Sequence, residues 1–253
     1  MSPETESGPA EPAHEPRPVD LLAVMPHRDD AELLCGGTLV RAVDRGHRAG
    51  VLDLTRGETG TRGSAERRRE EARRAARAMG LTVRANAEFP DAGLRNDDES
   101  RRRLVALLRR FRPRVVLLPW KRGRHPDHRI GSELARDACY LAGLAKYGEG
   151  EAHRPEKVAY ALAYREDPVK PTFVVDVTEQ FDRKMEAVRC YGSQFDDVER
   201  AGEIHPTGRP LYDRVETELR HYGSLIRRPY GEPFWTEETV RVDDPVELGV
   251  PTM

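Results

Sequence analysis

Two short segments of this 253-residue chain contain most of the neighbouring side chains that could bind a metal ion. These side chains are His27, Asp29, Asp30 and Glu32 in the first segment, and His125, Asp127 and His128 in the second. Two histidines and one carboxylate make up a common catalytic zinc site, in which one position stays open for water. The same ligands suit ferrous iron, so the residue types alone do not identify the metal.

A structural role would explain either segment taken alone. Asp29 or Asp30 could cap a helix that begins near Ala31, and Asp127 could cap the helix after the second segment. However, both segments follow apolar strand patterns, and the carboxyl ends of parallel strands meet at one edge of a sheet. The chain has only eight histidines, and three of them fall in these two segments. We therefore prefer a shared metal site to two unrelated helix caps.

The elements that must position these side chains alternate between strand and helix. Apolar runs predict strands at 19–25, 48–55, 82–89, 113–120, 157–164 and 172–178. Amphipathic patterns predict helices at about 30–45, 66–80, 97–111, 178–192 and 213–226, and one that follows the second segment and ends near Leu144. This alternation is typical of an α/β fold with a doubly wound, mostly parallel sheet and helices on both faces. We expect a Rossmann-like sheet with the metal site at its C-terminal strand ends.

The organisation of the chain indicates one domain between two tails. Residues 1–17 are acidic and proline-rich with little to bury, so we expect a disordered N-terminal tail. A single domain is expected over residues 18–240, followed by a C-terminal tail at 241–253. Within the first helix, Gly36 and Gly37 each cost about 1 kcal/mol relative to alanine. Close packing of that helix over the sheet would explain them, and so would a close approach of the loop to the metal.

Composition argues against several classes of partner. The net charge is −2, which does not favour binding to nucleic acid or to an anionic membrane surface. The apolar runs are too short to cross a bilayer, and the first residues lack the apolar segment of a signal peptide. Cys35, Cys139 and Cys190 are isolated from one another in the sequence. We expect reduced thiols and a cytoplasmic location.

The segments "HRDDAE…GGT" and "RHPDH", with "LTRGETGTRGSAERRREEA" between them, resemble the zinc-dependent N-deacetylases of the PIG-L/LmbE-like family. The similarity extends from about Val19 to Trp235 and includes "PDAGL", "YGSQF" and "GEPFW". These last motifs most resemble the bacillithiol-biosynthesis branch, whose members deacetylate N-acetylglucosaminyl malate. Arg28 stands where the family usually has proline. We expect its guanidinium to point away from the metal or to pair with an acid, because a cation beside a bound dication is costly.

The resemblance implies a role for each catalytic residue. The metal ligands would be His27, Asp30 and His128, with one zinc ion per chain. Asp29 would be the general base, which deprotonates the attacking water. His125 would stabilise the oxyanion and could protonate the departing amine. Asp127 would pair with His125 and orient its imidazole.

The resemblance also implies how the substrate is held. Arg68 matches a substrate-binding arginine, Asp91 matches an aspartate that bonds sugar hydroxyls, and Arg124 is placed to meet malate carboxylates. Asp91 could equally be a turn residue, and Arg124 could be an ordinary surface arginine. The expected partner is a small amino-sugar conjugate. Relatives are commonly trimers or hexamers, so a homo-oligomer is expected.

The glycine-rich stretch 55–64, "TRGETGTRGS", leaves a second class of function open. It follows a strand and precedes a helix, where a loop could hold a nucleotide phosphate. It lacks both the GxGxxG spacing and the Lys-Ser/Thr ending of a P-loop. A metal-dependent deacetylase acting on N-acetylglucosaminyl malate is therefore our leading hypothesis. The alternatives are a deacetylase or amidase for another N-acetylglucosamine or thiol-sugar conjugate, and a non-catalytic nucleotide-binding module.

Overall fold

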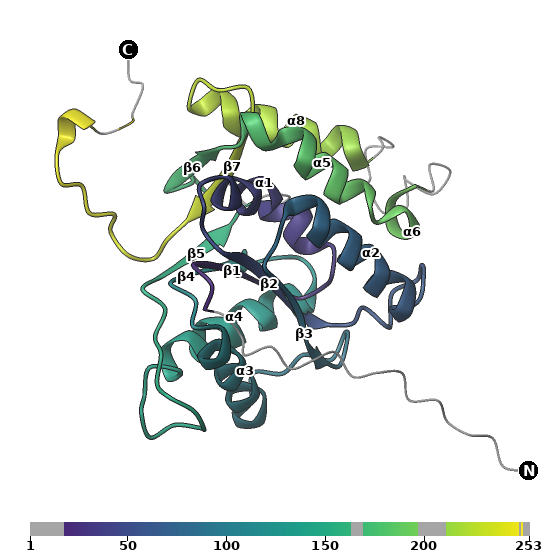
Figure 1. The fold of residues 1–253 in the computed structure, drawn as a ribbon, viewed down its shortest axis with the longest axis vertical. Helices are drawn as coiled ribbons and strands as arrows, with labels where there is room; N and C mark the ends of the chain where they lie inside the picture. The colour runs from purple at the N-terminus through teal and green to yellow at the C-terminus, as the bar shows by residue number, and fades with distance from the viewer. Residues whose placement is uncertain (1–17, 163–168, 197–210, 248, 250–253) are drawn as a thin grey trace, which may run out of the picture.

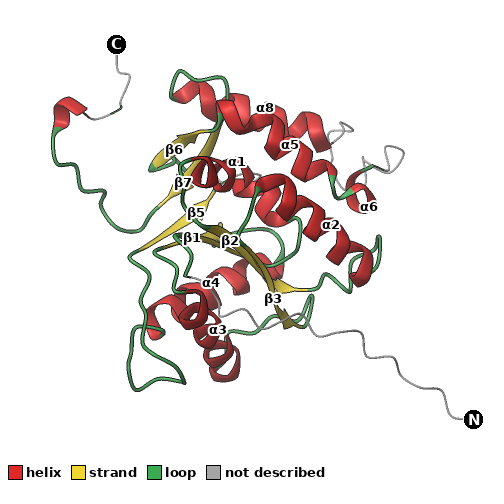
Figure 2. Cartoon of the chain, viewed as in Figure 1, coloured by secondary structure: helices red, strands yellow, loops and turns green. Residues whose placement is uncertain are grey.

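The computed structural model describes residues 18–162, 169–196, 211–247 and 249. The described chain forms a seven-stranded sheet with helices on both faces (Figure 1; Figure 2). The strands are β1 (Leu21–Met25), β2 (Ala49–Thr55), β3 (Val83–Phe89), β4 (Val115–Pro119), β5 (Lys157–Ala161), β6 (Phe173–Asp176) and β7 (Gly231–Trp235). The helices are α1 (Asp30–Asp44), α2 (Ala65–Met79), α3 (Asp98–Phe111), α4 (Pro126–Leu141), α5 (Phe181–Arg189), α6 (Gly192–Phe195) and α8 (Leu211–Leu225). Two short 3-10 helices are η1 (Thr178–Gln180) and η3 (Pro245–Glu247).

The strand order β3-β2-β1-β4-β5-β7-β6 confirms a doubly wound, mostly parallel sheet. The first five strands in this order are parallel, and β7 runs antiparallel to both β5 and β6. Helices α1, α2 and α5 cover one face, while α3 and α4 cover the other (Figure 1). The neighbouring strands β1 and β4 lead to helices on opposite faces. In such sheets the crevice between two strands of this kind is where ligands bind.

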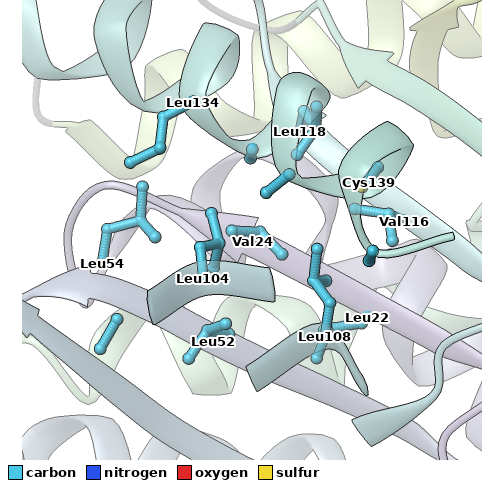
Figure 3. Close-up of a cluster of buried hydrophobic side chains, with 14 of the residues drawn as sticks. Leu22, Val24, Leu52, Leu54, Leu104, Leu108, Val116, Leu118, Leu134 and Cys139 are labelled. Atoms are coloured by element: carbon cyan, nitrogen blue, oxygen red, sulfur yellow. The ribbon is translucent and has the colours of Figure 1, made fainter. Parts of the chain in front are cut away.

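The strands that lead to the site are buried on both sides. All five residues of β1 are buried, as expected for a central parallel strand covered on both faces. On the face covered by α3 and α4, leucines and valines from the strands and from both helices form one cluster (Figure 3). Burying each such side chain stabilises the fold by about 1.5–3 kcal/mol. The loops after β1 and β4 are therefore anchored to a well-packed part of the sheet.

Local sequence signals set several helix ends. The Ser64 side chain accepts the Arg67 N–H at the start of α2, and Gly80 ends that helix with φ 72°. Asp97 caps α3 by accepting the Ser100 N–H. Strand β7 was not predicted, because its five residues "GEPFW" include both glycine and proline, which are depleted in strands. Helix α4 ends at Leu141, three residues before the predicted end near Leu144.

The predicted N-terminal tail, residues 1–17, lies outside the described residues. Within the C-terminal tail, the described side chains from Arg241 to Val246 are exposed. All three cysteines are free. Among the described residues, no helix combines the length and the apolar character that crossing a bilayer requires.

Candidate active site

The loops after β1 and β4 bring three imidazole rings together. The His27 ring centroid lies 4.8 Å from that of His125 and 5.5 Å from that of His128. Asp30 lies between two of these rings, with Oδ2 3.2 Å from His27 Nδ1 and Oδ1 3.2 Å from His128 Nε2. Ligand atoms of His27, Asp30 and His128 all lie within 4.8 Å of one another. The three residues predicted as ligands therefore form a group that could hold a metal ion.

None of the three aspartates of the two segments serves as a helix cap. Asp29 occupies the N-cap position of α1, but its side chain makes no capping hydrogen bond. At α4 the N-cap residue is His125, whose Nδ1 accepts the Asp127 N–H at 3.1 Å. The structural alternative for these carboxylates is thus wrong.

The second ring nitrogen of His27 faces two more carboxylates. Its Nε2 lies 3.3 Å from Asp91 Oδ1 and 3.6 Å from Asp127 Oδ2. A metal-bound histidine usually donates its other N–H to a carboxylate, which fixes the ring. Burial alone would lower the pKa of His27, but hydrogen bonds to Asp127, Asp30 and Asp91 raise it to about 12. The surroundings therefore favour positive charge at this point, and the residues fit a divalent metal ion.

Asp127 contacts different groups from those predicted. Its carboxylate was expected to orient the His125 ring, but its Oδ2 accepts the Ala92 N–H at 2.8 Å and faces His27. The described contact with His125 is made by the Asp127 backbone instead. The buried Oδ1 of Asp127 has no hydrogen-bond partner among the described atoms. Asp127 therefore supports a predicted metal ligand, because its carboxylate faces that ring.

Asp91 is also engaged by protein groups. Its Oδ2 accepts both the Thr59 N–H at 2.8 Å and the Thr59 hydroxyl at 2.6 Å. Its Oδ1 faces His27, and its side chain is only 5% exposed. A sugar hydroxyl would have to compete with these contacts. The structure thus gives Asp91 a place between the metal group and the glycine-rich loop, and sugar binding by Asp91 stays a prediction.

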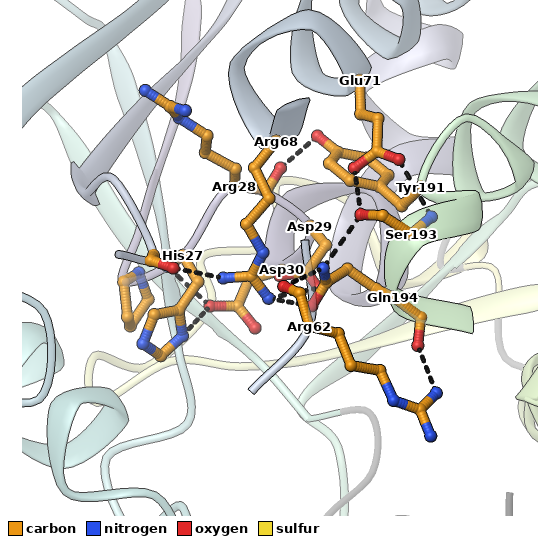
Figure 4. A network of polar contacts seen from close by, with 12 residues as sticks. His27, Arg28, Asp29, Asp30, Arg62, Arg68, Glu71, Tyr191, Ser193 and Gln194 are labelled. Atoms are coloured by element: carbon orange, nitrogen blue, oxygen red, sulfur yellow. Dashed lines mark hydrogen bonds and ion pairs between the residues drawn. The ribbon is translucent and has the colours of Figure 1, made fainter. Parts of the chain in front are cut away.

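Asp29 lies beside the metal group without belonging to it (Figure 4). Its side chain is 15% exposed, and its Oδ2 lies 4.0 Å from Arg68 Nη2. Burial and the neighbouring Asp30 raise the pKa of Asp29, while Arg68 and His27 act in the opposite direction. A carboxylate with a raised pKa is a stronger base than an exposed one.

Arg68 lies between the glycine-rich loop and the Asp29 carboxylate and contacts both. Its guanidinium donates to the Gly57 carbonyl at 3.2 Å and to the side-chain oxygen of Gln194. Gly57 has φ +70°, and a Cβ atom there would collide with the guanidinium. The close approach of arginine explains the glycine, so this feature of the loop does not require a nucleotide phosphate.

The segment α6 holds Arg68 in this position, which sequence reasoning missed. Gln194 Nε2 donates to the Arg62 carbonyl at 2.9 Å. The Ser193 N–H and hydroxyl both donate to the buried carboxylate of Glu71, at 2.9 and 2.7 Å. Figure 4 shows these contacts converging from α2 and α6 beside Asp29. The motif "YGSQF" was the available signal, but its residue types alone indicated no role.

Arg28 is buried, and its guanidinium extends away from the metal group, as predicted (Figure 4). The guanidinium donates to the Ala65 carbonyl in the first turn of α2. The Arg28 backbone carbonyl, which lies between a ligand and the base, accepts from Arg84 Nη2 and from the Tyr191 hydroxyl. Arg84 in turn makes two bonds of 2.9 Å to the buried Asp53. These supporting residues were not predicted as part of the site.

Replacing Arg28 with proline should change zinc affinity by less than about tenfold, below the range typical of residues that support a ligand. The side chain contacts α2 and not the metal group, so its loss leaves the ligands in place. Competition titration with a chromophoric chelator measures the affinity. Arg28→Met, which removes the charge and keeps the length, is the control. A large rise in affinity in Arg28→Pro alone would contradict this expectation.

Comparison with known proteins identifies the family. Residues 22–139 match the family model described as PIG-L, GlcNAc-PI de-N-acetylase. The chain is 31% identical over 229 residues to diacetylchitobiose deacetylase of Thermococcus kodakarensis, covering 84% of this chain and 80% of that one. The chain belongs to the PIG-L deacetylase family. It is an enzyme of the N-deacetylase type, and the predicted LmbE-like resemblance is confirmed at the level of the family.

Two further proteins, one compared by structure and one by sequence, are similar to this chain. The crystal structure of the conserved protein TT1542 from Thermus thermophilus superposes with a TM-score of 0.80 and 41% identity, covering 88% of this chain and 97% of that one. The 4-oxalmesaconate hydratase of Pseudomonas putida is 28% identical over 201 residues, covering 68% of this chain and 73% of that protein. Relatives named for hydration and for deacetylation are thus both similar to this chain, so its substrate must be argued from its own site.

Proposed function

We propose that this PIG-L enzyme uses zinc to hydrolyse the acetamide of an N-acetylglucosamine conjugate, and that N-acetylglucosaminyl malate is its favoured substrate. The observation that carries this proposal is the position of Asp29, a carboxylate beside the metal group that is free of capping bonds. A relative named for deacetylating diacetylchitobiose supports an N-acetylated sugar as the substrate class. The malate aglycone rests on the resemblance to the bacillithiol branch.

The first chemical step depends on Asp29. A zinc ion held by His27, Asp30 and His128 would supply Lewis acidity toward the acetamide carbonyl and would lower the pKa of water to about 7. Asp29 accepts the proton of the attacking water as the C–O bond forms. Its raised pKa suits this task, since a more basic carboxylate retains the proton until it is transferred to the departing amine.

His125 stabilises the negative charge that develops on the carbonyl oxygen. Its Nδ1 accepts the Asp127 N–H, so a neutral ring carries its proton on Nε2 and donates from there. The sequence prediction also allowed His125 to protonate the amine. A neutral ring with a single proton is a poor acid for that step. We assign it to Asp29, which returns the proton taken from water as the C–N bond breaks.

We propose that Arg124 binds the malate aglycone of the substrate. It is exposed and directly precedes His125, the N-cap of α4. Arginine binds a carboxylate through two parallel N–H donors, which lysine cannot do. Arg124→Ala should therefore weaken transition-state stabilisation for N-acetylglucosaminyl malate, measured from kcat/KM, by about 1.5–3 kcal/mol. Free N-acetylglucosamine should react almost as before.

Kinetics on both substrates check this expectation for Arg124. The matched control is Arg122→Ala, another exposed arginine of the same basic run, which should leave both substrates unaffected. Equal losses on the two substrates in Arg124→Ala would mean that the residue supports the loop and does not bind malate.

Acetate release from a panel of conjugates tests the function as a whole. The zinc-loaded protein is incubated with N-acetylglucosaminyl malate, diacetylchitobiose, an N-acetylglucosaminyl thiol-sugar conjugate and free N-acetylglucosamine. We expect acetate from all four, with the malate conjugate fastest. A faster reaction of another conjugate would remove the malate assignment. Absence of acetate from every member would overturn the deacetylase proposal.

A further inference from the structure

Helix α1 is broken one turn after the loop that carries the metal group. Cys35 has φ −148° and ψ 19°, so the helix consists of a first turn at 30–34 and a longer segment at 36–44. A break in a helix leaves backbone N–H and C=O groups without partners inside the helix. Most residues around this break are buried, so other parts of the chain must supply the missing hydrogen bonds.

The carboxylate of Glu232 in β7 caps the second segment. Its Oε1 accepts the Gly37 N–H at 2.8 Å, and its Oε2 accepts the Thr38 N–H at 2.7 Å. The Thr38 hydroxyl adds a bond of 2.6 Å to Oε2. With Cys35 as the N-cap residue, these two N–H groups are the ones that a capping side chain normally bonds. Glu232 thus does from a distant strand what a local aspartate usually does.

Lys184 in α5 holds the other side of the break. Its ammonium donates to the Leu33 carbonyl at 2.7 Å and to Glu232 Oε1 at 2.7 Å. The Lys184 and Glu232 side chains are 0% and 1% exposed. A cation at the carbonyl end of one segment and an anion at the N–H end of the next both match the partial charges of helix ends. The ion pair therefore bridges the break.

The glycine at position 37 makes this arrangement possible. A Cβ atom there would lie 2.8 Å from Val177 Cβ and 3.1 Å from Glu232 Oε1. Any larger residue would push the carboxylate away from the N–H groups that it caps. The close packing expected from the sequence is thus found at Gly37. Its consequence is that β7 reaches the helix that carries the metal group.

We propose that the Lys184–Glu232 pair is a positioning device that fixes the break of α1 and thereby aims Asp29 and Asp30. The first turn begins at these two carboxylates, and near its end lies Leu33, whose carbonyl accepts a hydrogen bond from Lys184. This inference rests on the proposed function only in naming Asp29 the base and Asp30 a ligand. Both partners of the pair lie outside the 22–139 stretch that matches the family model.

Metal binding by Glu232→Gln and Lys184→Met tests this inference. Each variant weakens one side of the bridge, and each should lower zinc affinity about 10- to 100-fold, as loss of a ligand's support does. The visible absorption of the Co²⁺-loaded protein should also change in shape, because it reports the coordination geometry. The control is Val105→Ala, which removes buried volume from α3 on the opposite face of the sheet. It should lower Tm but keep both the zinc affinity and the cobalt spectrum.

Thr38→Val is a milder variant that deletes a single hydrogen bond to Glu232 and keeps the side-chain shape. It should shift zinc affinity in the same direction by a smaller factor, even if the stronger variants do not fold. If these variants lower Tm but leave metal affinity and cobalt spectrum like those of Val105→Ala, the pair is only structural and the inference is wrong. These readouts need no substrate. If the wild-type protein binds cobalt but releases no acetate, the proposed function is wrong, and the metal-binding test of the Lys184–Glu232 pair can still be carried out.

Discussion

Asp29→Asn should lower turnover about 10²- to 10⁴-fold while the protein keeps its zinc, because removing a general base costs about that much. The amide keeps the size of the carboxylate but cannot accept the proton of the attacking water. Asp29 is outside the group whose ligand atoms lie within 4.8 Å of one another, so metal binding should survive. Initial rates of acetate release, together with zinc content by mass spectrometry, measure the two properties on the same sample.

The matched control for Asp29→Asn is Asp213→Asn, the same change at an exposed position in the first turn of α8. It should leave both turnover and zinc content unchanged. Turnover close to wild type in Asp29→Asn, with zinc retained, would remove Asp29 from the mechanism. Loss of zinc together with turnover would instead make Asp29 a ligand.

The sequence pointed to the candidate metal-binding side chains because they follow two strands that are easy to recognise, and the choice of three ligands among them came from the family resemblance. The runs that become β1 and β4 are almost wholly apolar, as strands covered on both faces must be. His27 lies two residues after β1, and His128 lies nine residues after β4 in the first turn of α4, so the topology brings both to one edge of the sheet. A histidine is also rare enough in this chain for its position to carry information.

The contacts that hold these ligands could not be predicted, because they join residues that are far apart in the sequence. Arg84 on β3 reaches the Arg28 carbonyl, and Tyr191 reaches the same atom from the start of α6. Nothing in the local sequence of either residue indicates this partner. The direction of a side chain was also beyond sequence reasoning: Asp127 was assigned to His125, its near neighbour, but its carboxylate faces His27.

The break in α1 shows the same limit. Two adjacent glycines indicated that something approaches the helix, but the sequence did not say what. The answer depends on β7, a strand that was not predicted, and on a buried lysine in a predicted helix. Removing one partner of a buried pair is strongly destabilising, because it leaves an uncompensated charge. Such positions therefore constrain the fold and the site together.

His128→Ala should abolish stoichiometric zinc binding, whereas His125→Ala should keep the metal and lose turnover. His128 Nε2 lies 3.2 Å from Asp30 Oδ1 and completes the group with His27. Its removal leaves two protein ligands, too few for the three that a catalytic zinc site uses. The affinity should fall by more than the roughly 100-fold that loss of a supporting residue costs. Zinc content after dialysis and competition titration measure the effect.

His125 is the informative comparison, because the two histidines lie at the N-terminus of α4 and in the same ring cluster. Their ring centroids are 5.7 Å apart, and a second group of His27, His125 and Asp127 also has its ligand atoms within 4.8 Å. In that second group, His125 Nδ1 already accepts the Asp127 N–H and Asp127 Oδ2 accepts the Ala92 N–H, so a metal there would have to use His125 Nε2 and the buried Asp127 Oδ1. The first group keeps the Asp30 carboxylate between its two rings. Zinc loss in His125→Ala, with retention in His128→Ala, would move the metal to the second group and reverse the assignment of these two histidines.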